Sequence, residues 1–222
     1  MMRRATLLAT VALGLTLGAC GGPEKIVVDK YFGAVNQEDS QTLTAFATVA
    51  FDKKVDDWKI VQTVSSTEEP APLPELVKLA KEADNEVSKN QREINFYTNQ
   101  HPNEVTDVMD LMRGRKPIPA RLQGVADTLE RYNAKKKELR QALARAKERV
   151  DKEKQTVILS VGDVDNLETL TGTMATRQIE LLLTIGGEKS PYLMTLRQYK
   201  LQAAPGVRSQ NRWVVCGLEP KK

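Results

Sequence analysis

The chain is poor in the residues that build disulfide frameworks, histidine metal sites and membrane spans. Its 222 residues include two cysteines, one histidine and 5% aromatic residues. Two cysteines cannot form the set of bridges that holds many small secreted domains together. A lone histidine, His101, excludes a histidine-rich metal site and leaves a single base for any histidine-based triad. The mostly apolar run at residues 5–15 is shorter than the roughly 20 residues that cross a bilayer as a helix.

The sequence also lacks a phosphate loop, a nucleophile elbow and a paired-cysteine metal motif. Asp163-Val164-Asp165 resembles the start of a calcium loop only superficially, because Glu168 and Met174 occupy the positions that need glycine and a bidentate glutamate. The carboxylates of Asp163, Asp165 and Glu180 lie in or near expected strands, where we expect them to be solvated; acid–base work is the alternative. We therefore predict no enzyme activity, no cofactor and no metal site.

The charges of the chain nearly cancel. It has 33 Lys and Arg against 29 Asp and Glu, and two of the arginines, Arg3 and Arg4, precede the apolar run. Without residues 1–19, 31 basic and 29 acidic side chains remain, a net charge of +2. This balance argues against a general nucleic-acid binder, so we expect no nucleic-acid partner.

The first twenty residues have the parts of a secretory leader: Arg3 and Arg4, the apolar run and a small-residue exit. The exit, Leu17-Gly18-Ala19-Cys20, resembles the bacterial lipobox. That resemblance implies cleavage before Cys20, a thioether-linked diacylglycerol on its sulfur and an acyl chain such as palmitate on the new amino terminus. Two or three chains anchor a protein stably, whereas one binds marginally. The alternative is an ordinary leader with a chance cysteine.

The residue after the lipobox cysteine is Gly21. In Gram-negative lipoproteins an aspartate there is the usual signal for inner-membrane retention, so the resemblance implies the outer membrane, facing the periplasm. With Cys20 lipidated, Cys216 has no partner within the chain. It stands in the apolar stretch 213–218, so we expect a buried, inert thiol, with a reactive one as the alternative.

Two short helices and a strand are expected first. Residues 24–36 carry apolar side chains at a helical period, and Asp39 or Ser40 is placed to cap a second helix that turns Leu43 inward. The run 58–64 reads as a strand. The stretch 65–74 is rich in Pro and Glu, and its three prolines predict a linker.

A long helical hairpin follows in the pattern. One helix starts at Pro74, a second helical piece covers 104–112, a turn covers 113–117, and a long helix covers about 120–154. The long helix has apolar residues in steps of three and four, the spacing of a coiled-coil seam. Each helix has one polar seam member, Asn90 and Lys136. Aligning these two in antiparallel helices also brings Val87 near Leu139 and both helix roots together, so we predict a register with an Asn90/Lys136 layer.

The remainder reads as β-structure. We expect strands at 156–161, 179–185, 192–201 and 212–218, an uncertain strand and bend within 166–177, a hairpin loop at 186–191 and a polar loop at 203–211.

This order of elements is similar to the nuclear-transport-factor-2-like superfamily. The resemblance rests on residues 28–35 with Asp39 and Leu43, on Trp58, and on the ending Arg212-Trp213-Val214-Val215. It covers about 24–66 and 155–218 and implies an α+β cone, in which a curved antiparallel sheet wraps the short N-terminal helices. Residues 75–154 depart from that pattern, and we interpret them as an inserted antiparallel coiled-coil hairpin. The expected organisation is a leader at 1–19, a cone-like domain at 20–66 and 155–222, and a linker plus hairpin at 67–154.

Two functions are compatible with this organisation, because a fold alone supplies none. The first is a non-enzymatic binding or scaffolding module that contacts an envelope protein or polymer through the hairpin and sheet. Its candidate basic contact surface is the hairpin tip with Arg113, Arg115 and Lys116, supported by the basic excess of the long helix. An ordinary solvated helix face is the alternative for these charges. The second function is a small-molecule-binding or enzymatic pocket inside the cone, with an inward polar group from Tyr31, Glu180 or Tyr199. We expect His101 at the surface.

Overall fold

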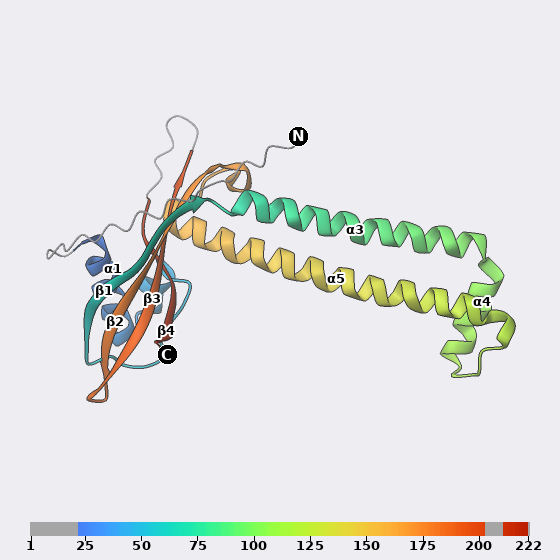
Figure 1. The fold of residues 1–222 in the computed structure, drawn as a ribbon, viewed down its shortest axis with the longest axis horizontal. Helices are drawn as coiled ribbons and strands as arrows, with labels where there is room; N and C mark the ends of the chain where they lie inside the picture. Colours follow the sequence, from blue (N-terminus) through green and yellow to red (C-terminus); the bar gives the residue numbers. More distant parts are fainter. Residues whose placement is uncertain (1–21, 203–210, 222) are drawn as a thin grey trace, which may run out of the picture.

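The computed structural model describes residues 22–202 and 211–221 and has an α+β architecture. A four-stranded antiparallel sheet and two short helices form a body, from which a long helical extension projects to one side (Figure 1). The strands follow each other in the sheet in chain order, β1-β2-β3-β4. The expected α+β class is thus confirmed. The leader and Cys20 lie outside the described residues.

The body begins with helices α1 (Pro23–Asn36) and α2 (Ser40–Thr44). Proline suits the first turn of α1, because its missing N–H has no helical partner there. The carboxylate of Asp39 accepts a hydrogen bond from the backbone N–H of Thr42 at 2.9 Å and so caps α2, as the sequence indicates. The buried side of α1 carries Val28, Tyr31, Phe32 and Val35.

The sheet consists of β1 (Asp57–Pro70), β2 (Gly172–Ile185), β3 (Glu188–Leu201) and β4 (Val214–Pro220). Strands β2 and β3 pair without interruption along their full length. Gly186 and Gly187 connect them, both with positive φ, at 59° and 83°. A two-residue hairpin turn of type I′ has positive φ at both positions, which glycine adopts at low cost. The loop expected at 186–191 is therefore only two residues long, and Pro191 belongs to β3, opposite Leu182 of β2.

Helices cover both faces of the sheet. On one face, Ile179, Leu181 and Leu183 of β2 pack with the α1 and α2 side chains in the main hydrophobic core. Alternate residues of a strand point to opposite faces. On the other face, Met174 and Tyr199 pack against the last two turns of α5 in a second cluster.

The extension consists of α3 (Leu73–Gln100), α4 (Pro102–Arg113) and α5 (Ala120–Val161). Helices α3 and α5 run side by side, with α4 at their far end (Figure 1). The 42 residues of α5 correspond to a length of about 63 Å. Lys135 pairs with Glu93 at 3.4 Å, and the Tyr132 ring lies 5.8 Å from that of Tyr97. Both contacts lie within a turn of the register predicted from the sequence, while the Asn90/Lys136 layer itself stays a prediction.

Two expected boundaries are wrong, one on each side of the extension. Residues 65–70 of the linker expected at 65–74 are instead the end of β1, paired with β2 as far as Pro70 opposite Thr173, and α3 begins at Leu73. The strand expected at 156–161 is the last part of α5, which ends at Gly162 with φ 93°. Val157 and Val161 are buried there against Leu73. Tertiary packing therefore overrides the β-propensity of these branched residues.

Candidate binding surface

The interior of the body is filled by side chains. The ring of Phe32 lies 5.3 Å from the ring of Trp58, and both pack with leucines of β2 that have no exposed surface. Tyr31, one of the predicted inward polar groups, is fully buried, and its hydroxyl donates to the backbone carbonyl of Val49 at 3.1 Å. Burial raises the pKa of Tyr31 to about 12. A filled interior counts against a ligand pocket between the sheet and α1.

Glu180, the second predicted inward group, lies on the opposite face of the sheet from α1. It stands between Ile179 and Leu181, which both point into the main core, and strand residues alternate between faces. One of its carboxylate oxygens accepts from Gln62 at 2.7 Å and lies 2.8 Å from Lys221. Hydrogen bonds from Lys221 and then Gln62 lower the pKa of Glu180. The prediction that Glu180 faces inward is therefore wrong, and its ion pair indicates a structural role.

Tyr199, the third of these groups, belongs to a buried polar cluster at the root of the extension. Its hydroxyl donates to a carboxylate oxygen of Glu153 on α5 at 2.5 Å, and the other oxygen of Glu153 accepts from Arg197 at 3.3 Å. Burial, followed by the hydrogen bond to Glu153, raises the pKa of Tyr199. Glu153 itself is only 7% exposed. The cluster joins α5 to β3 through charge-assisted hydrogen bonds.

Ser160, about two helical turns further along α5, forms a second connection between this helix and the sheet. Its hydroxyl accepts the backbone N–H of Tyr199 at 2.9 Å and donates to the carbonyl of Arg212 at 2.7 Å. Sequence reasoning missed both Glu153 and Ser160. A signal existed for Glu153, because Ala146, Val150, Glu153 and Val157 continue the three-and-four spacing of the seam. A carboxylate at such a position requires a buried partner.

The predicted environment agrees with the structure for Cys216 and agrees only in part for His101. Cys216 is partly buried, and burial raises its pKa to about 11, so the thiol stays protonated at neutral pH, as an inert thiol should. His101 is half-buried at the junction of α3 and α4, with its ring 4.7 Å from that of Tyr97. The expected surface position of His101 is thus only partly correct. Asp163 and Asp165 are exposed, as expected of solvated carboxylates.

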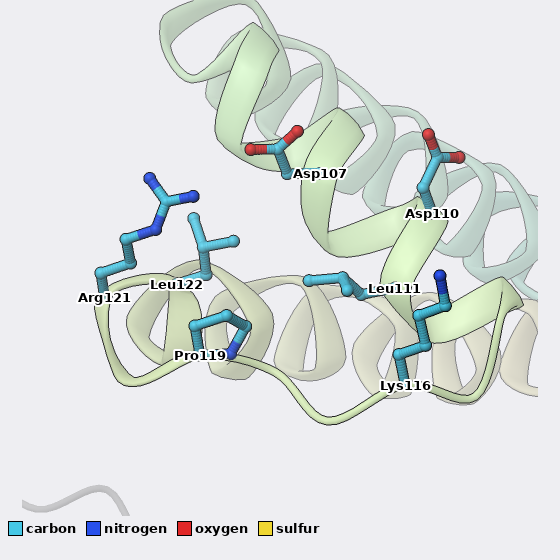
Figure 2. A pocket seen from close by; sticks show the side chains of 7 residues that line it. All are labelled: Asp107, Asp110, Leu111, Lys116, Pro119, Arg121 and Leu122. Atoms are coloured by element: carbon cyan, nitrogen blue, oxygen red, sulfur yellow. The ribbon is translucent and has the colours of Figure 1, made fainter.

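The tip of the extension contains a cleft of about 380 Å³. Figure 2 shows Asp107 and Asp110 of α4 on one side of it and Lys116, Pro119 and Arg121 on the other, with two leucines between them. The leucines, Leu111 and Leu122, give the cleft an apolar floor.

The predicted basic residues of the tip are all exposed, but the fold adds carboxylates to them. Arg113 lies 3.2 Å from Asp110, Arg115 has the positive φ of a tight turn, and Lys116 lines the cleft opposite Asp110. The tip is therefore a surface of mixed charge, not a purely basic one. Such a surface can form ion pairs with both signs of charge on a partner.

A second cavity of about 380 Å³ lies halfway along α5. The side chains that line it come from Asn133, Lys136, Lys137, Arg140, Gln141 and Ala144. Both cavities belong to the extension and neither to the body.

Three further observations bear on function. Within residues 22–202 and 211–221, no group of three or more His, Cys, Asp or Glu side chains is placed to hold a metal ion. No helix of the same residues is long and apolar enough to cross a membrane. Comparisons with known protein families, with characterised proteins and with solved structures found no match to this chain.

Proposed function

We propose that this chain is a lipid-anchored protein of the bacterial envelope that binds or scaffolds a partner through its helical extension and is not an enzyme. The observation that carries the proposal is the contrast between a body with a filled interior and an extension whose surface is hollowed at its tip and halfway along α5. A long two-helix arm exposes far more surface than its own packing requires. Binding a partner protein or polymer gives that surface a use.

The anchor follows from the lipobox-like residues and from how the body begins. Lipidation at Cys20 would place the acyl chains three residues before α1. Glu24 in the first turn of α1 forms an ion pair with Arg177 of β2, whose guanidinium lies 4.8 Å from the centre of the Trp213 ring. This contact fixes the start of α1 to the sheet, so acyl chains on Cys20 would hold the body close to the membrane. We place the protein in the outer membrane, facing the periplasm, because Gly21 is not the aspartate of a retention signal.

The proposal includes a cone-like body of the nuclear-transport-factor-2-like kind with an inserted coiled-coil hairpin. It is supported by the two helices packed on one face of an antiparallel sheet and by the entry and exit of the extension between β1 and β2. The three-and-four spacing of α5 and the contacts of Glu93 with Lys135 and of Tyr97 with Tyr132 support the coiled-coil interpretation.

The experiment places a photoreactive amino acid in the full chain in cells, at Arg121 in the tip cleft or at exposed Lys189 next to the β2–β3 turn as the control. We expect the tip position to crosslink to a discrete protein or envelope polymer and the control position not to. A second variant removes residues 80–147, which keeps Val77 and Val150 at the root. Crosslinks from the body that are equally abundant with and without the arm, together with none from the tip, would contradict the proposal.

The anchor has its own test. Replacing Cys20 with alanine should move the protein from the membrane fraction to the soluble periplasm, and mass spectrometry of the wild-type amino terminus should show acyl chains. An unmodified Cys20 would remove the anchor from the proposal.

A further inference from the structure

One flank of α5 carries a row of cations that form no ion pair with the described residues. Lys136, Lys137 and Arg140 line the mid-helix cavity, and Lys147 follows two turns later. At 100° per residue, positions 133, 136, 137, 140, 144 and 147 fall within about 100° of one another around the helix. The cations therefore share one side of the helix and span about 16 Å of its length.

Acidic residues are absent from the part of this flank that lines the cavity. By the same helical arithmetic, exposed Asp151 falls on the flank one turn beyond Lys147, and Glu148 falls at its edge. Between residues 131 and 149 the helix has eight basic residues and two acidic ones, Glu138 and Glu148. Glu138 falls on the opposite flank by the same helical arithmetic. Glu148 lies three turns beyond Lys137 and pairs with Lys152 at 2.6 Å. The cavity lining has no carboxylate of its own.

The flank cations are also unpaired within the described chain. Lys135, their immediate neighbour, reaches Glu93 of α3 across the seam at 3.4 Å. In contrast, no carboxylate within residues 22–202 and 211–221 lies within 4.0 Å of Lys136, Lys137 or Arg140. Three adjacent unpaired cations around a hollow are a surface for an anionic partner.

We propose that this flank binds an acidic α-helix of a partner protein. This inference rests on the proposed function and specifies the chemical character of the partner. Lys136 and Lys137 stand about one helical turn from Arg140, an axial spacing of about 4.5–6 Å. Carboxylates at positions i and i+4 of a partner helix have the same spacing. The short side chains of Asn133 and Ala144 border the cavity and let a partner backbone come close.

A membrane surface and a nucleic acid fit this flank less well. Binding in the plane of a membrane needs apolar side chains beside the basic ones. The large exposed apolar residues of the described chain lie elsewhere, and none falls between 131 and 149. Single-stranded nucleic acid is held by stacking on aromatic side chains. The only aromatic residue of this stretch, Tyr132, packs against Tyr97 of α3.

The test measures fluorescence anisotropy of a labelled synthetic helix, with glutamates at i,i+4 spacing, against the full lipidated chain in neutral detergent micelles. A second peptide has the same composition with its glutamates scrambled, and vesicles with anionic lipids form a separate arm. The flank variant K136Q/K137Q/R140Q is compared with R131Q/R145Q/R149Q, which removes the same charge from the other side of α5. Circular dichroism checks that both variants remain helical.

We expect the flank variant to weaken binding of the spaced peptide by about tenfold and the control variant by less than about threefold. The scrambled peptide should bind more weakly than the spaced one. Equal losses in both variants, or equal binding of both peptides, would overturn the inference. Flank-dependent binding to anionic vesicles without peptide binding would overturn it in favour of a membrane surface.

This outcome can be separated from that of the proposed function. If the tip still crosslinks to a partner in cells that carry the flank variant, and the spaced peptide does not bind, the acidic-helix inference fails while partner binding by the extension stands. If neither tip nor flank contacts a partner, the proposed function fails.

Discussion

The body and the extension of this protein bury their side chains to very different degrees. The main core of the body contains sixteen buried residues from α1, α2, the segments near them and three strands. The cluster at the tip of the extension contains five, and between tip and root most seam residues of α5 are only half-buried. A two-helix arm cannot surround its seam, whereas a sheet covered by helices can. The body therefore provides stability, and the arm provides exposed length.

The largest effect should come from the body core. Phe32→Ala removes a fully buried ring that contacts Tyr31 and Trp58, so we expect unfolding to become easier by about 3–5 kcal/mol. Leu139→Ala, at a half-buried seam position of α5, should cost about 1 kcal/mol. Chemical denaturation monitored by tryptophan fluorescence and by circular dichroism measures both variants. Similar losses for the two would mean that the arm is packed as tightly as the body.

The next effect lies where the two regions meet. Glu153→Ala leaves the Tyr199 hydroxyl and the Arg197 guanidinium without their shared acceptor. We expect a loss of about 2–4 kcal/mol, below the range for fully buried pairs because the Arg197 side chain keeps 35% of its surface exposed. Glu153→Gln keeps an oxygen for Tyr199 and should cost less.

Hydrogen exchange localises this effect. The root of α5 and the adjacent part of β3 should lose protection in Glu153→Ala, while α1 keeps its protection. Unchanged protection at the root would show that the cluster does not hold the arm to the sheet.

Within the extension, which we also call the arm, one residue should make the fold less stable than an apolar residue would at the same position. Asn90 is 1% exposed, and neither polar atom of its side-chain amide has a hydrogen-bond partner among residues 22–202 and 211–221. Asn90→Leu should therefore stabilise the arm by about 1–2 kcal/mol, measured as slower hydrogen exchange in α3 and α5. Asn99→Leu, at an exposed position of the same helix, is the control and should change little. A faster exchange in Asn90→Leu would show that the amide specifies the helix register, as a polar seam residue does in coiled coils.

The same contrast explains which features the sequence could predict. Helical spacing identified α1, α3 and α5, and Gly186-Gly187 marked the hairpin, because these signals are local. Residues 65–70 form a strand through pairing with residues more than 100 positions away, and residues 156–161 are helical because α5 reaches the far face of the sheet. The local propensities of these residues therefore could not predict either element.

The candidate sites divide in the same way. The basic tip residues Arg113, Arg115 and Lys116 are exposed as expected, but the cleft depends on how α4 folds back toward the start of α5. The Glu153–Tyr199 bond joins residues 46 apart and needs the register of β3 against α5. The unpaired flank of α5 could be found only after Lys135 and Glu93 had been placed together.

The smallest effect on stability separates two neighbouring lysines of α5. Lys135→Gln removes an exposed ion pair between helices, with about half of the lysine side chain in solvent, and should cost about 0.2–1 kcal/mol in arm stability. Lys137→Gln removes a cation that has no carboxylate near it in the described chain, so stability should stay unchanged within error. For binding of the acidic helix the order should reverse, because Lys137 lines the cavity and Lys135 does not. Hydrogen exchange and peptide anisotropy on the same two variants measure both orders. If Lys135→Gln weakens peptide binding as much as Lys137→Gln does, the arm attracts acidic peptides by its overall charge and has no distinct binding flank.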